Sequence, residues 1–429
     1  MKIPLHFGTD ILHLDIPQGN IAAVLQPRHI ETNHSDEEIL SEAIITNQHA
    51  LVQQVRGRTV GILLPDGTRD LPIESIFPPL LEALKSAGRF LFFICTGSHD
   101  PDTTENDRIL EIIKSQVATA GIQHYEIVIH DCRKAAFSNA GVTQRGTEVL
   151  YNSRLDEVDV FCILSDIKHH YFAGYSNPVK NIAPGLCAFK TIERNHSLTF
   201  DSRSCAGIHP WHPDPTRRDN PLANDLKEVM QRIVNNRPIW ALVTISHDKA
   251  IQWAALGPVE DVTAQAFQKT DAWNLRTVEK VDYMVVSPGG LPNDVDLYIS
   301  QRALELTHTV VRDGGQILLL AACPGGIGSE LTRKHFENKL TEAPTAILQQ
   351  KPRDYHLFEH KPYRFAQLIQ RLDKLWLHTS IPSNTVRRMH MFPTKDPQEV
   401  AAGWIRQQPE SKILFVKGAN KLLLKPRCG

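Results

Sequence analysis

The sequence lacks the features that would place it in several large classes of protein. No apolar run reaches the roughly 20 residues that a membrane-spanning helix requires, and the N-terminal residues MKIPLHFGTD lack the apolar core of a secretory signal. No charge of one sign dominates, because 47 Lys and Arg oppose 48 Asp and Glu, a formal net charge of −1. Composition therefore gives no reason to expect a nucleic acid or a membrane as partner, and a cytoplasmic location is expected.

Two common kinds of cysteine and glycine motif are also missing. The seven cysteines are scattered, odd in number and include no CxxC pair, so reduced thiols are the simplest expectation. No G-x-G-x-x-G fingerprint of a dinucleotide site occurs in the first 150 residues. The glycine-rich run 324–328 follows a predicted strand and would suit an anion at a helix start, but it does not have the fingerprint's spacing.

What is present is the patterning of an α/β protein. With 429 residues, 41% of them hydrophobic, and a mean hydropathy of −0.26, the chain is long enough for two or three globular domains. Apolar runs of strand length alternate with segments of helical spacing, which predicts two Rossmann-like α/β domains built on parallel sheets. Strands are expected at 60–64, 90–95, 125–129, 158–164, 239–245, 283–286, 316–321, 375–378 and 413–416. Helices are expected at 75–87, 222–233 and 295–306.

We place the main domain boundary at about residue 275, because a connection near 264–279 precedes a second series of strands and helices. Residues 1–274 are predicted to form an N-terminal α/β domain and residues 275–420 a C-terminal one. The short apolar tail within 421–429 is expected to pack back on the first domain. The active site is expected in the cleft between the two domains, a common place for a small-ligand site.

Polar stretches follow four of the predicted strands, at 65–69, 96–100, 166–170 and 287–294. Ligands of open α/β sheets bind beyond the carboxyl ends of the strands, which in a parallel sheet share one edge. Taken alone, each stretch has an ordinary explanation as a turn or a surface loop, in a chain with 20 histidines. Their shared position at one edge of the sheet indicates that the side chains of these stretches lie close together. The converging residues are expected to be Asp66, Arg69, His99 and His170, faced by the Gly289-Gly290 loop of the second domain.

The segment from His170 to His196 contains the most reactive combination of side chains. Two histidines bracket Lys180 in a stretch punctuated by glycine and proline. An imidazole can move protons near neutral pH or bind a soft metal, and a lysine amine can form a covalent link to a carbonyl-type group. The segment is therefore a candidate for cofactor chemistry, although Lys180 could equally be a surface lysine beside a helix. His209 and His212 look like a metal pair but have no evident further ligands, and we interpret them as a loop.

Taken in order, these motifs resemble the nickel-dependent lactate racemase family over most of the chain. The resemblance implies a racemase or epimerase of a small 2-hydroxy acid that carries a nickel-pincer nucleotide, made from a nicotinate nucleotide by separate enzymes that are transient partners. In that cofactor a pyridinium ring bearing a thioamide and a thiocarboxylate is tethered to a lysine, and two sulfurs, a ring carbon and a histidine bind nickel in a square plane. The markers are Asp66-Gly-Thr-Arg69, Thr96-Gly-Ser-His99, the segment HYFAGYS at 170–176, Lys180, His196 and Gly289-Gly-Leu-Pro-Asn-Asp294.

The resemblance implies a role for each matching residue. The catalytic set is His99 and His170 as acid and base, Arg69, and Asp66 beside the arginine. The cofactor set is Lys180 as the tether, His196 as the nickel ligand, and Ser176, Thr68 and Tyr298. The substrate set is Arg69, Arg302 and Ile299.

The implied chemistry accounts for this combination of groups. Simple deprotonation at C2 of a 2-hydroxy acid is slow, because the carboxylate resists further negative charge. Removing hydride instead gives a flat 2-keto acid, and a cofactor must hold that hydride since side chains cannot. One neutral imidazole can take the alcohol proton, and a second on the opposite side can supply one when hydride returns to the other face. Arg69 can hold the carboxylate by a bidentate pair about which the keto group turns.

The chain departs from the family pattern in two places. The glycines that usually precede the lysine are replaced by Asn177-Pro178-Val179, so a phosphate seat built from those amides must differ. In a later helix the family's Tyr-Gln-x-x-Lys becomes Tyr298-Ile299-x-x-Arg302. Tyr298 and Arg302 share a helix face, and the arginine keeps the charge on a wider planar fork. A substrate other than lactate is therefore expected, such as a larger or more polar sugar acid, although Ile299 would also suit an apolar one.

The expected function is inversion at C2 of a 2-hydroxy acid by a cytoplasmic enzyme, for which a homo-oligomer is compatible with the sequence. Two alternatives stay open. A nicotinamide-dependent 2-hydroxyacid dehydrogenase would require the dinucleotide fingerprint that the first 150 residues lack. A carboxylate-binding family member without cofactor is favoured by the altered segment 177–179.

Overall fold

The computed structural model describes residues 1–28, 30, 33–69, 71–247 and 250–427, and the chain divides into two units. The central unit is His29–Asp271, and the terminal unit combines Met1–Arg28 with Ala272–Gly429. The expected boundary near residue 275 is close to the observed one, but the first 28 residues belong with the C-terminal part. The reason is strand pairing: β3 (Ile21–Leu25) lies in parallel beside β19 (Ile413–Val416) and so extends the sheet of the terminal unit.

The segment at the boundary is also more regular than expected. Helix α8 (Val259–Asn274) continues past the end of the central unit, and β14 (Leu275–Val278) follows it without a loop. The apolar tail forms β20 (Leu423–Pro426), which pairs in parallel with β14, a strand of its own unit. The expected return of the tail to the first domain is therefore replaced by pairing within the terminal unit, which satisfies the backbone groups of both strands.

The central unit is built on a six-stranded sheet with the order β13-β12-β9-β4-β5-β6. Its elements are α1 (Asp36–Ile45), α2 (Gln48–Val55), β4 (Thr59–Pro65), α3 (Ile73–Leu84), β5 (Arg89–Cys95), α4 (Thr104–Thr119), β6 (Tyr125–Ile129), β7 (Phe137–Val142), β8 (Glu148–Asn152), β9 (Val160–Asp166), β10 (Lys168–His170), β11 (Gly174–Ser176), α5 (Val179–Ile182), α6 (Phe189–His196), α7 (Pro221–Val234), β12 (Ile239–His247), β13 (Ala250–Pro258) and α8. All neighbours in the sheet are parallel except β12 and β13, which are too close in sequence for a parallel crossover.

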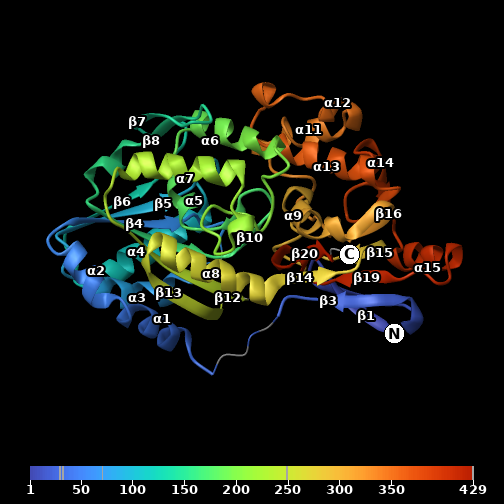
Figure 1. Ribbon diagram of the computed structural model, residues 1–429, viewed down its shortest axis with the longest axis horizontal. Coiled ribbons are helices and arrows are strands. Elements are labelled where there is room, and N and C mark those ends of the chain that lie inside the picture. Colours follow the sequence, from blue (N-terminus) through green and yellow to red (C-terminus); the bar gives the residue numbers. More distant parts are fainter. Residues whose placement is uncertain (29, 31–32, 70, 248–249, 428–429) are drawn as a thin grey trace. The chain divides into compact units, whose positions relative to one another are not determined.

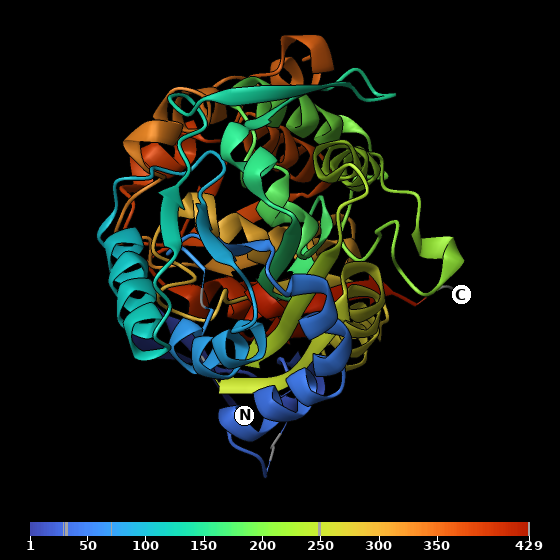
Figure 2. The same cartoon turned by 90° about the vertical axis from the view of Figure 1, so that its left-hand side faces the viewer.

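The strand order of the central unit places a ligand-binding position at β4. From β4 the chain extends to β5 and β6 on one side and to β9 and β12 on the other, so the order reverses between β4 and β9. Ligands of such sheets bind beyond the carboxyl ends of the strands at this reversal. Helices α1 to α4 cover one face and α5 to α7 the other, as Figure 1 and the turned view in Figure 2 show. Alternate strand residues such as Ile62, Phe92 and Cys162 are buried under α1 to α4.

The terminal unit has a second six-stranded sheet, of order β18-β17-β16-β15-β19-β3, in which every neighbouring pair is parallel. An antiparallel hairpin of β1 and β2 packs with it. The elements not yet given are β1 (Lys2–Phe7), β2 (Asp10–Asp15), β15 (Val281–Val286), α9 (Leu297–Thr307), β16 (Val311–Leu320), α10 (Glu330–Arg333), α11 (Glu337–Leu340), α12 (Pro344–Leu348), α13 (His360–Arg371), β17 (Lys374–His378), α14 (Ser383–Arg388), β18 (Phe392–Pro393) and α15 (Pro397–Gln407). Two predominantly parallel α/β units confirm the predicted fold class.

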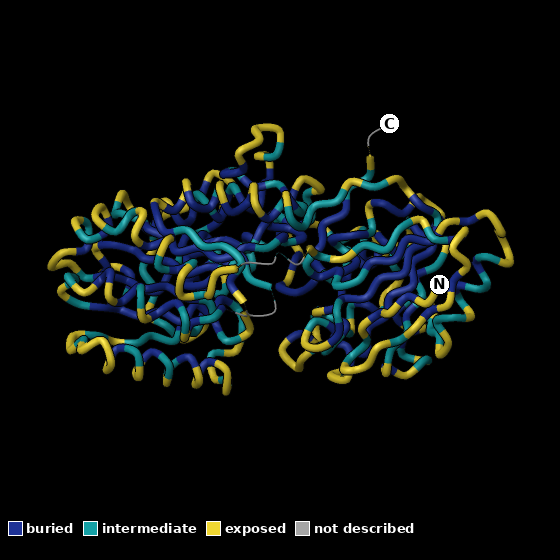
Figure 3. Tube along the Cα trace, turned by 90° about the horizontal axis from the view of Figure 1, so that it is seen from below, coloured by how far each residue is buried: buried dark blue, intermediate teal, exposed yellow. Residues whose placement is uncertain are grey.

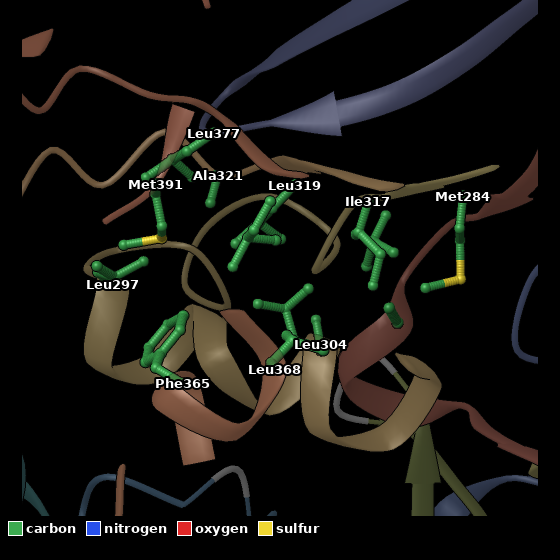
Figure 4. Packing of buried hydrophobic residues seen from close by; sticks show 14 of the residues in the cluster. Met284, Leu297, Leu304, Ile317, Leu319, Ala321, Phe365, Leu368, Leu377 and Met391 are labelled. Atoms are coloured by element: carbon green, nitrogen blue, oxygen red, sulfur yellow. The ribbon is translucent and has the colours of Figure 1, made fainter. Parts of the chain in front are cut away.

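Helix α9, which carries Tyr298, is held on the sheet of the terminal unit by apolar packing. Leu297 and Leu304 of α9 and Phe365 of α13 meet the side chains of β16 and β17 in Figure 4. Figure 3 shows the strands of both sheets as buried, with exposed residues concentrated in helices and loops at the outside of each unit. None of the described helices combines the length and the apolar character that a membrane crossing requires.

Candidate functional site

The loop after β4 holds a buried carboxylate against a histidine from the loop after β5. Asp66 is 3% exposed, its Oδ2 lies 2.7 Å from Nδ1 of His99, and its Oδ1 accepts a hydrogen bond from the Thr68 hydroxyl over 2.9 Å. Since a carboxylate offers only acceptors, Nδ1 of His99 is the donor, and Nε2 of the neutral ring is left to accept a proton. Burial alone would raise the pKa of Asp66, but the charge and hydrogen bond of His99, with Arg69 and Thr68, bring the pKa below its usual value.

The same loop is shaped by contacts with the start of α4. The amide of Gly67 donates to Oδ1 of Asn106 over 2.9 Å, and a Cβ added at Gly67 would lie 2.3 Å from Cβ of Glu105. Only glycine allows this approach. Arg69, at the end of the loop, places Nε 4.0 Å from Oδ1 of Asp66 and keeps 42% of its side chain exposed. Its guanidinium is therefore accessible to an anionic ligand.

The hairpin of β10 and β11, which follows β9, presents His170. Nδ1 of His170 accepts the amide of Ala173 over 3.3 Å, so the neutral ring carries its proton on Nε2. Gly174 allows the tight return, because it has a φ of +78° and a Cβ there would lie 2.0 Å from the carbonyl oxygen of Ile208. Ser176 is the last residue of β11, where it pairs with Lys168, and it lies three residues before the start of α5.

Phe172, in the turn of this hairpin, is a common neighbour of three predicted site residues. The ring of His170 stands edge-on to it at a centroid distance of 4.4 Å, and the ring of His196 does so at 5.3 Å. Nζ of Lys180 lies 5.6 Å from the centre of the Phe172 ring. The acid–base candidate, the tether candidate and the metal-ligand candidate thus surround one aromatic ring, which we call the Phe172 cluster. Phe172 lies within the marker segment 170–176 but was not singled out, since an aromatic residue in a short loop gives no distinguishing signal.

His196 is the last residue of α6 and is held as a neutral imidazole. Burial, then the positive charges of Lys180 and His99, lower the pKa of His196 to about 3. The end of α6 is fixed by its neighbour Asn195, whose Nδ2 donates to Oδ2 of Asp225 over 2.8 Å.

Lys180 lies in the short helix α5, which is held by hydrogen bonds at the point where the strand order reverses between β4 and β9. The next residue, Asn181, donates its side-chain amide to the carbonyl of Leu164 in β9 over 2.7 Å and to that of Leu63 in β4 over 3.4 Å. These two strands flank the expected ligand position, so Lys180 is brought to it by the hydrogen bonds of its neighbour.

The segment Asn177-Pro178-Val179, which departs from the family pattern, forms its own turn. Oδ1 of Asn177 accepts the amide of Val179 and the Asn177 carbonyl accepts the amide of Lys180, both over 3.0 Å. Asparagine commonly makes such a turn. The amides that would seat a phosphate in the family pattern therefore have acceptors within the segment, and a phosphate would need other donors.

In the terminal unit, α9 carries the remaining predicted residues, Tyr298, Ile299 and Arg302. Nζ of Lys361, from α13, lies 4.0 Å from the centre of the Tyr298 ring and donates to the Tyr298 carbonyl. Burial, partly offset by Asp296 and Glu305 and reinforced by Arg302, lowers the pKa of Lys361 to about 7. Ile299 is 41% exposed. Lys361 was not predicted, because its partner Tyr298 is distant in sequence.

Two motifs that could have bound ligands form structural contacts instead. Nε2 of His212 faces Oδ2 of Asp271 at 3.2 Å, while His209 packs edge-on to Phe267 at 4.9 Å, so the two histidines serve the packing around α8. In the glycine-rich run 324–328 the amides of Gly325 and Gly326 donate to backbone carbonyls, and the helix after it has four residues. The carbonyls of Gly326 and Ile327 accept the amides of Leu297 and Tyr298, so the run supports the start of α9 rather than an anion.

Residues 7–207 match the protein family described as the lactate racemase N-terminal domain. The chain is similar to the lactate racemases. It is 24% identical over 338 residues to the lactate racemase of Thermoanaerobacterium thermosaccharolyticum, which covers 77% of this chain and 76% of that protein. It is 25% identical over 292 residues to the lactate racemase of Lactiplantibacillus plantarum, covering 65% of this chain and 64% of that protein.

Solved structures show that the chain has the fold of a lactate racemase apoprotein. The structure of the lactate racemase apoprotein from Thermoanaerobacterium thermosaccharolyticum matches with a TM-score of 0.84 and 22% identity, covering 99% of this chain and 100% of that chain. A crystal structure of a protein from Thermotoga maritima matches with a TM-score of 0.64 and 14% identity, covering 93% and 100%.

The residues of this chain fit a metal that brings most of its own donors. Among the residues that the structure describes, no three His, Cys, Asp or Glu side chains are grouped so as to bind a metal ion. His196 would therefore be a single protein ligand. A neutral imidazole is the form that binds metal, and Lys180 lies on the same aromatic ring for a covalent tether.

Proposed function

We propose that the protein is a racemase or epimerase that inverts C2 of a 2-hydroxy acid, using a nickel-pincer nucleotide. The observation that carries this proposal is the Phe172 cluster, which gathers the Lys180 amine, the neutral His196 imidazole and His170 beside the Asp66–His99 pair. The relationship to lactate racemases supports the class of reaction. A cytoplasmic location belongs to the same proposal.

Lys180 and His196 would hold the cofactor. The Lys180 amine provides the tether through a thioamide, and His196 supplies the single imidazole donor to nickel. When bound, the cofactor would supply the hydride-accepting chemistry that side chains lack. Because the amides of residues 179 and 180 bond within their own turn, the phosphate must be held by other groups, for which Thr68 and Ser176 are the candidates.

The two remaining histidines would move the protons. Nδ1 of His99 donates a hydrogen bond to Asp66, so Nε2 is available to take the proton of the substrate hydroxyl. Asp66 stabilises the imidazolium that results. His170 would enter this step as an imidazolium, give one proton to the oxygen after the keto group has turned, and return to the neutral ring. The proton balance is restored through solvent before the next turnover.

Arg69 would bind the substrate carboxylate. The accessible guanidinium of Arg69 suits a bidentate pair with a carboxylate. The replacement of the family's glutamine and lysine by Ile299 and Arg302 favours a substrate other than lactate, such as a sugar acid.

The deciding experiment is coexpression with the enzymes that make the cofactor, followed by intact mass spectrometry and metal analysis. We expect a nucleotide-sized adduct and bound nickel in the wild type and neither in Lys180→Ala. Lys190→Ala is the matched control, because Lys190 lies on α6 with its amine paired to Glu148 and its side chain 73% exposed. The absence of an adduct from coexpressed wild type would refute the proposal and leave a cofactor-less carboxylate-binding protein.

Turnover of 2-hydroxy acids deuterated at C2 tests the reaction itself. Hydride transfer predicts that the inverted product keeps its deuterium, whereas exchange with water would contradict it. His99→Ala and His170→Ala should each slow inversion by about 10²- to 10⁴-fold while the adduct stays in place. Turnover that depends on added NAD would instead support a dehydrogenase. A panel from lactate to sugar acids ranks substrates by kcat/KM.

A further inference from the structure

A second group of histidines meets a carboxylate behind the hairpin that carries His170. Asp271, in the last turn of α8, is 13% exposed. Its Oδ1 accepts from Nε2 of His169 over 2.8 Å and from the Tyr175 hydroxyl over 2.7 Å. Its Oδ2 faces Nε2 of His212 at 3.2 Å and accepts from the Arg217 guanidinium. We call these five residues the Asp271 hub.

The Asp271 carboxylate has its full number of hydrogen-bond donors and remains ionised. A carboxylate has about four positions for donors, and all four are taken here. The tautomer of His212 agrees, since its Nδ1 accepts the amide of Asp214 over 3.0 Å and its Nε2 therefore donates. Burial would raise the pKa of Asp271, but the hydrogen bonds of His169 and His212 and the charges around it bring the pKa far below its usual value. A group in this state holds its partners and does not exchange protons near neutral pH.

Asp271 is hydrogen-bonded to both strands of the hairpin at one position, through His169 and Tyr175. His169 and Tyr175 are direct partners in the pairing of β10 with β11, and both donate to the same oxygen of Asp271. Tyr175 also stacks on Phe267 of α8 at a centroid distance of 4.0 Å. Since successive side chains of a strand point to opposite faces, the next residue, His170, is directed away from the hub. It meets Phe172 instead.

We propose that Asp271 is the positioning residue for His170. By fixing the hairpin one residue before His170, it holds that imidazole in the Phe172 cluster without touching substrate or cofactor. The catalytic consequence rests on the proposed function, whereas the positioning of the hairpin does not.

Asp225 provides a matched control elsewhere in the central unit. It too is buried and accepts several hydrogen bonds, from the Thr143 hydroxyl over 2.6 Å, the Thr147 hydroxyl over 2.8 Å and Nδ2 of Asn195 over 2.8 Å. Its contacts reach the end of α6, not the hairpin. Asp225→Asn should therefore disturb a different segment at a similar structural cost.

Hydrogen exchange of the full chain without cofactor tests the positioning directly. In Asp271→Asn we expect amides in 168–176 to exchange at least about tenfold faster, with 189–197 unchanged, and in Asp225→Asn the reverse. Tyr175→Phe removes one of the four donors and should give a smaller increase confined to 168–176, which keeps the test valid if Asp271→Asn does not fold. Unchanged exchange at 168–176 in these variants, or an equal increase throughout the central unit, would overturn the proposal.

Kinetics of the cofactor-loaded variants test the catalytic consequence. We expect Asp271→Asn to lower kcat per adduct-bearing chain by about 10- to 100-fold with an unchanged KM, since a small displacement of an acid–base group has that size of effect. Partial unfolding would reduce the number of adducts and leave kcat per adduct unaltered, and that result would overturn the role in catalysis. If no variant and no wild type inverts any 2-hydroxy acid, the proposed function fails while the exchange result still decides the positioning.

Discussion

Asp66 and Asp271 are both buried carboxylates of the central unit that accept hydrogen bonds from histidine rings, and in both the pKa is lowered despite burial. They differ in the accessibility of the partner. The side chain of His99 is 39% exposed, whereas those of His169 and His212 are 0% and 4% exposed. An imidazole that meets no solvent or substrate cannot exchange protons with them. The same pairing of residues therefore forms a working acid–base group in one place and a fixed support in the other.

The number of donors makes the same distinction. Asp66 accepts from His99 and Thr68, with Arg69 near Oδ1 at 4.0 Å, so its charge remains available to stabilise an imidazolium. Asp271 is surrounded by four donors that include a guanidinium, so its charge is already balanced. Changing each carboxylate to its amide should separate catalysis from stability.

Asp66→Asn should have the largest effect on the reaction. The amide cannot stabilise a charged His99 and can hold the ring in the wrong tautomer, so inversion should slow by about 10²- to 10⁴-fold. The adduct should stay in place, and the unfolding midpoint should fall less than in Asp271→Asn, because Asp66 accepts from two donors and Asp271 from four. Asp100→Asn, in the same loop as His99 but exposed, is the control. Activity of Asp66→Asn within threefold of wild type would show that His99 works without its carboxylate.

Asp271→Asn should instead have its main effect on stability. Leaving buried donors without their charged partner typically costs about 3–5 kcal/mol. The folded pKa of Asp271 lies below the unfolded value of about 3.9, so its contribution is complete above about pH 4 and is lost as the pH falls toward the folded pKa. Urea unfolding from pH 7 to pH 2.5 should show a steep acid loss in the wild type and a shallower one in the variant. Equal slopes would mean that the hub does not govern acid stability.

A third imidazole, His130, extends the comparison to a histidine held by neutral groups. Its Nε2 lies 3.0 Å from the Cys187 carbonyl oxygen and its Nδ1 3.2 Å from the amide nitrogen of Asn152. Burial lowers the pKa of His130 to about 4, although the carbonyl and Asp131 oppose this. The unfolded chain therefore binds the extra proton first, and stability is lost as the pH falls from about 6.5 to 4.

His130→Gln should remove this component. The slope of the unfolding free energy over that range should decrease by up to about 1.4 kcal/mol per pH unit. Urea titrations at pH 7, 6, 5 and 4.5 measure it, with the exposed His49→Gln as the reference. An unaltered slope would place the acid sensitivity in other buried histidines, such as His209.

The sequence predicted the parts of the site that depend on local pattern. Each expected strand and helix has its counterpart, because apolar runs such as 60–64 and 90–95 are buried on both faces of a parallel sheet. The polar residues after β4 and β5 do converge in the central unit, where Asp66 lies 2.7 Å from His99, since their strands are neighbours in the sheet. The convergence of Asp66 with His99 follows from that rule alone.

Contacts between segments far apart in the chain could not be predicted in this way. The run 21–25 is apolar, but nothing local pairs it with β19 almost four hundred residues later. Asp271 is separated from His169 by 102 residues, and its role depends on three other segments. His212 was considered for a metal pair because its partner was unknown. The spacing of residues in the sequence predicts which of them are neighbours on one helix or strand. The partners of a buried polar group come from several elements, and spacing does not predict them.

Thr68→Val is the smallest change that distinguishes the two carboxylates, and it also tests an expectation from the family resemblance. Thr68 donates to Oδ1 of Asp66 while His99 uses Oδ2, so its loss leaves the histidine contact intact. We expect a loss of about 1 kcal/mol in stability, an inversion rate two- to tenfold lower and an unchanged KM. If instead the variant keeps its rate per adduct but carries fewer adducts by intact mass, Thr68 serves the cofactor and not Asp66. Thr104→Val is the control, because Thr104 is exposed at the start of α4.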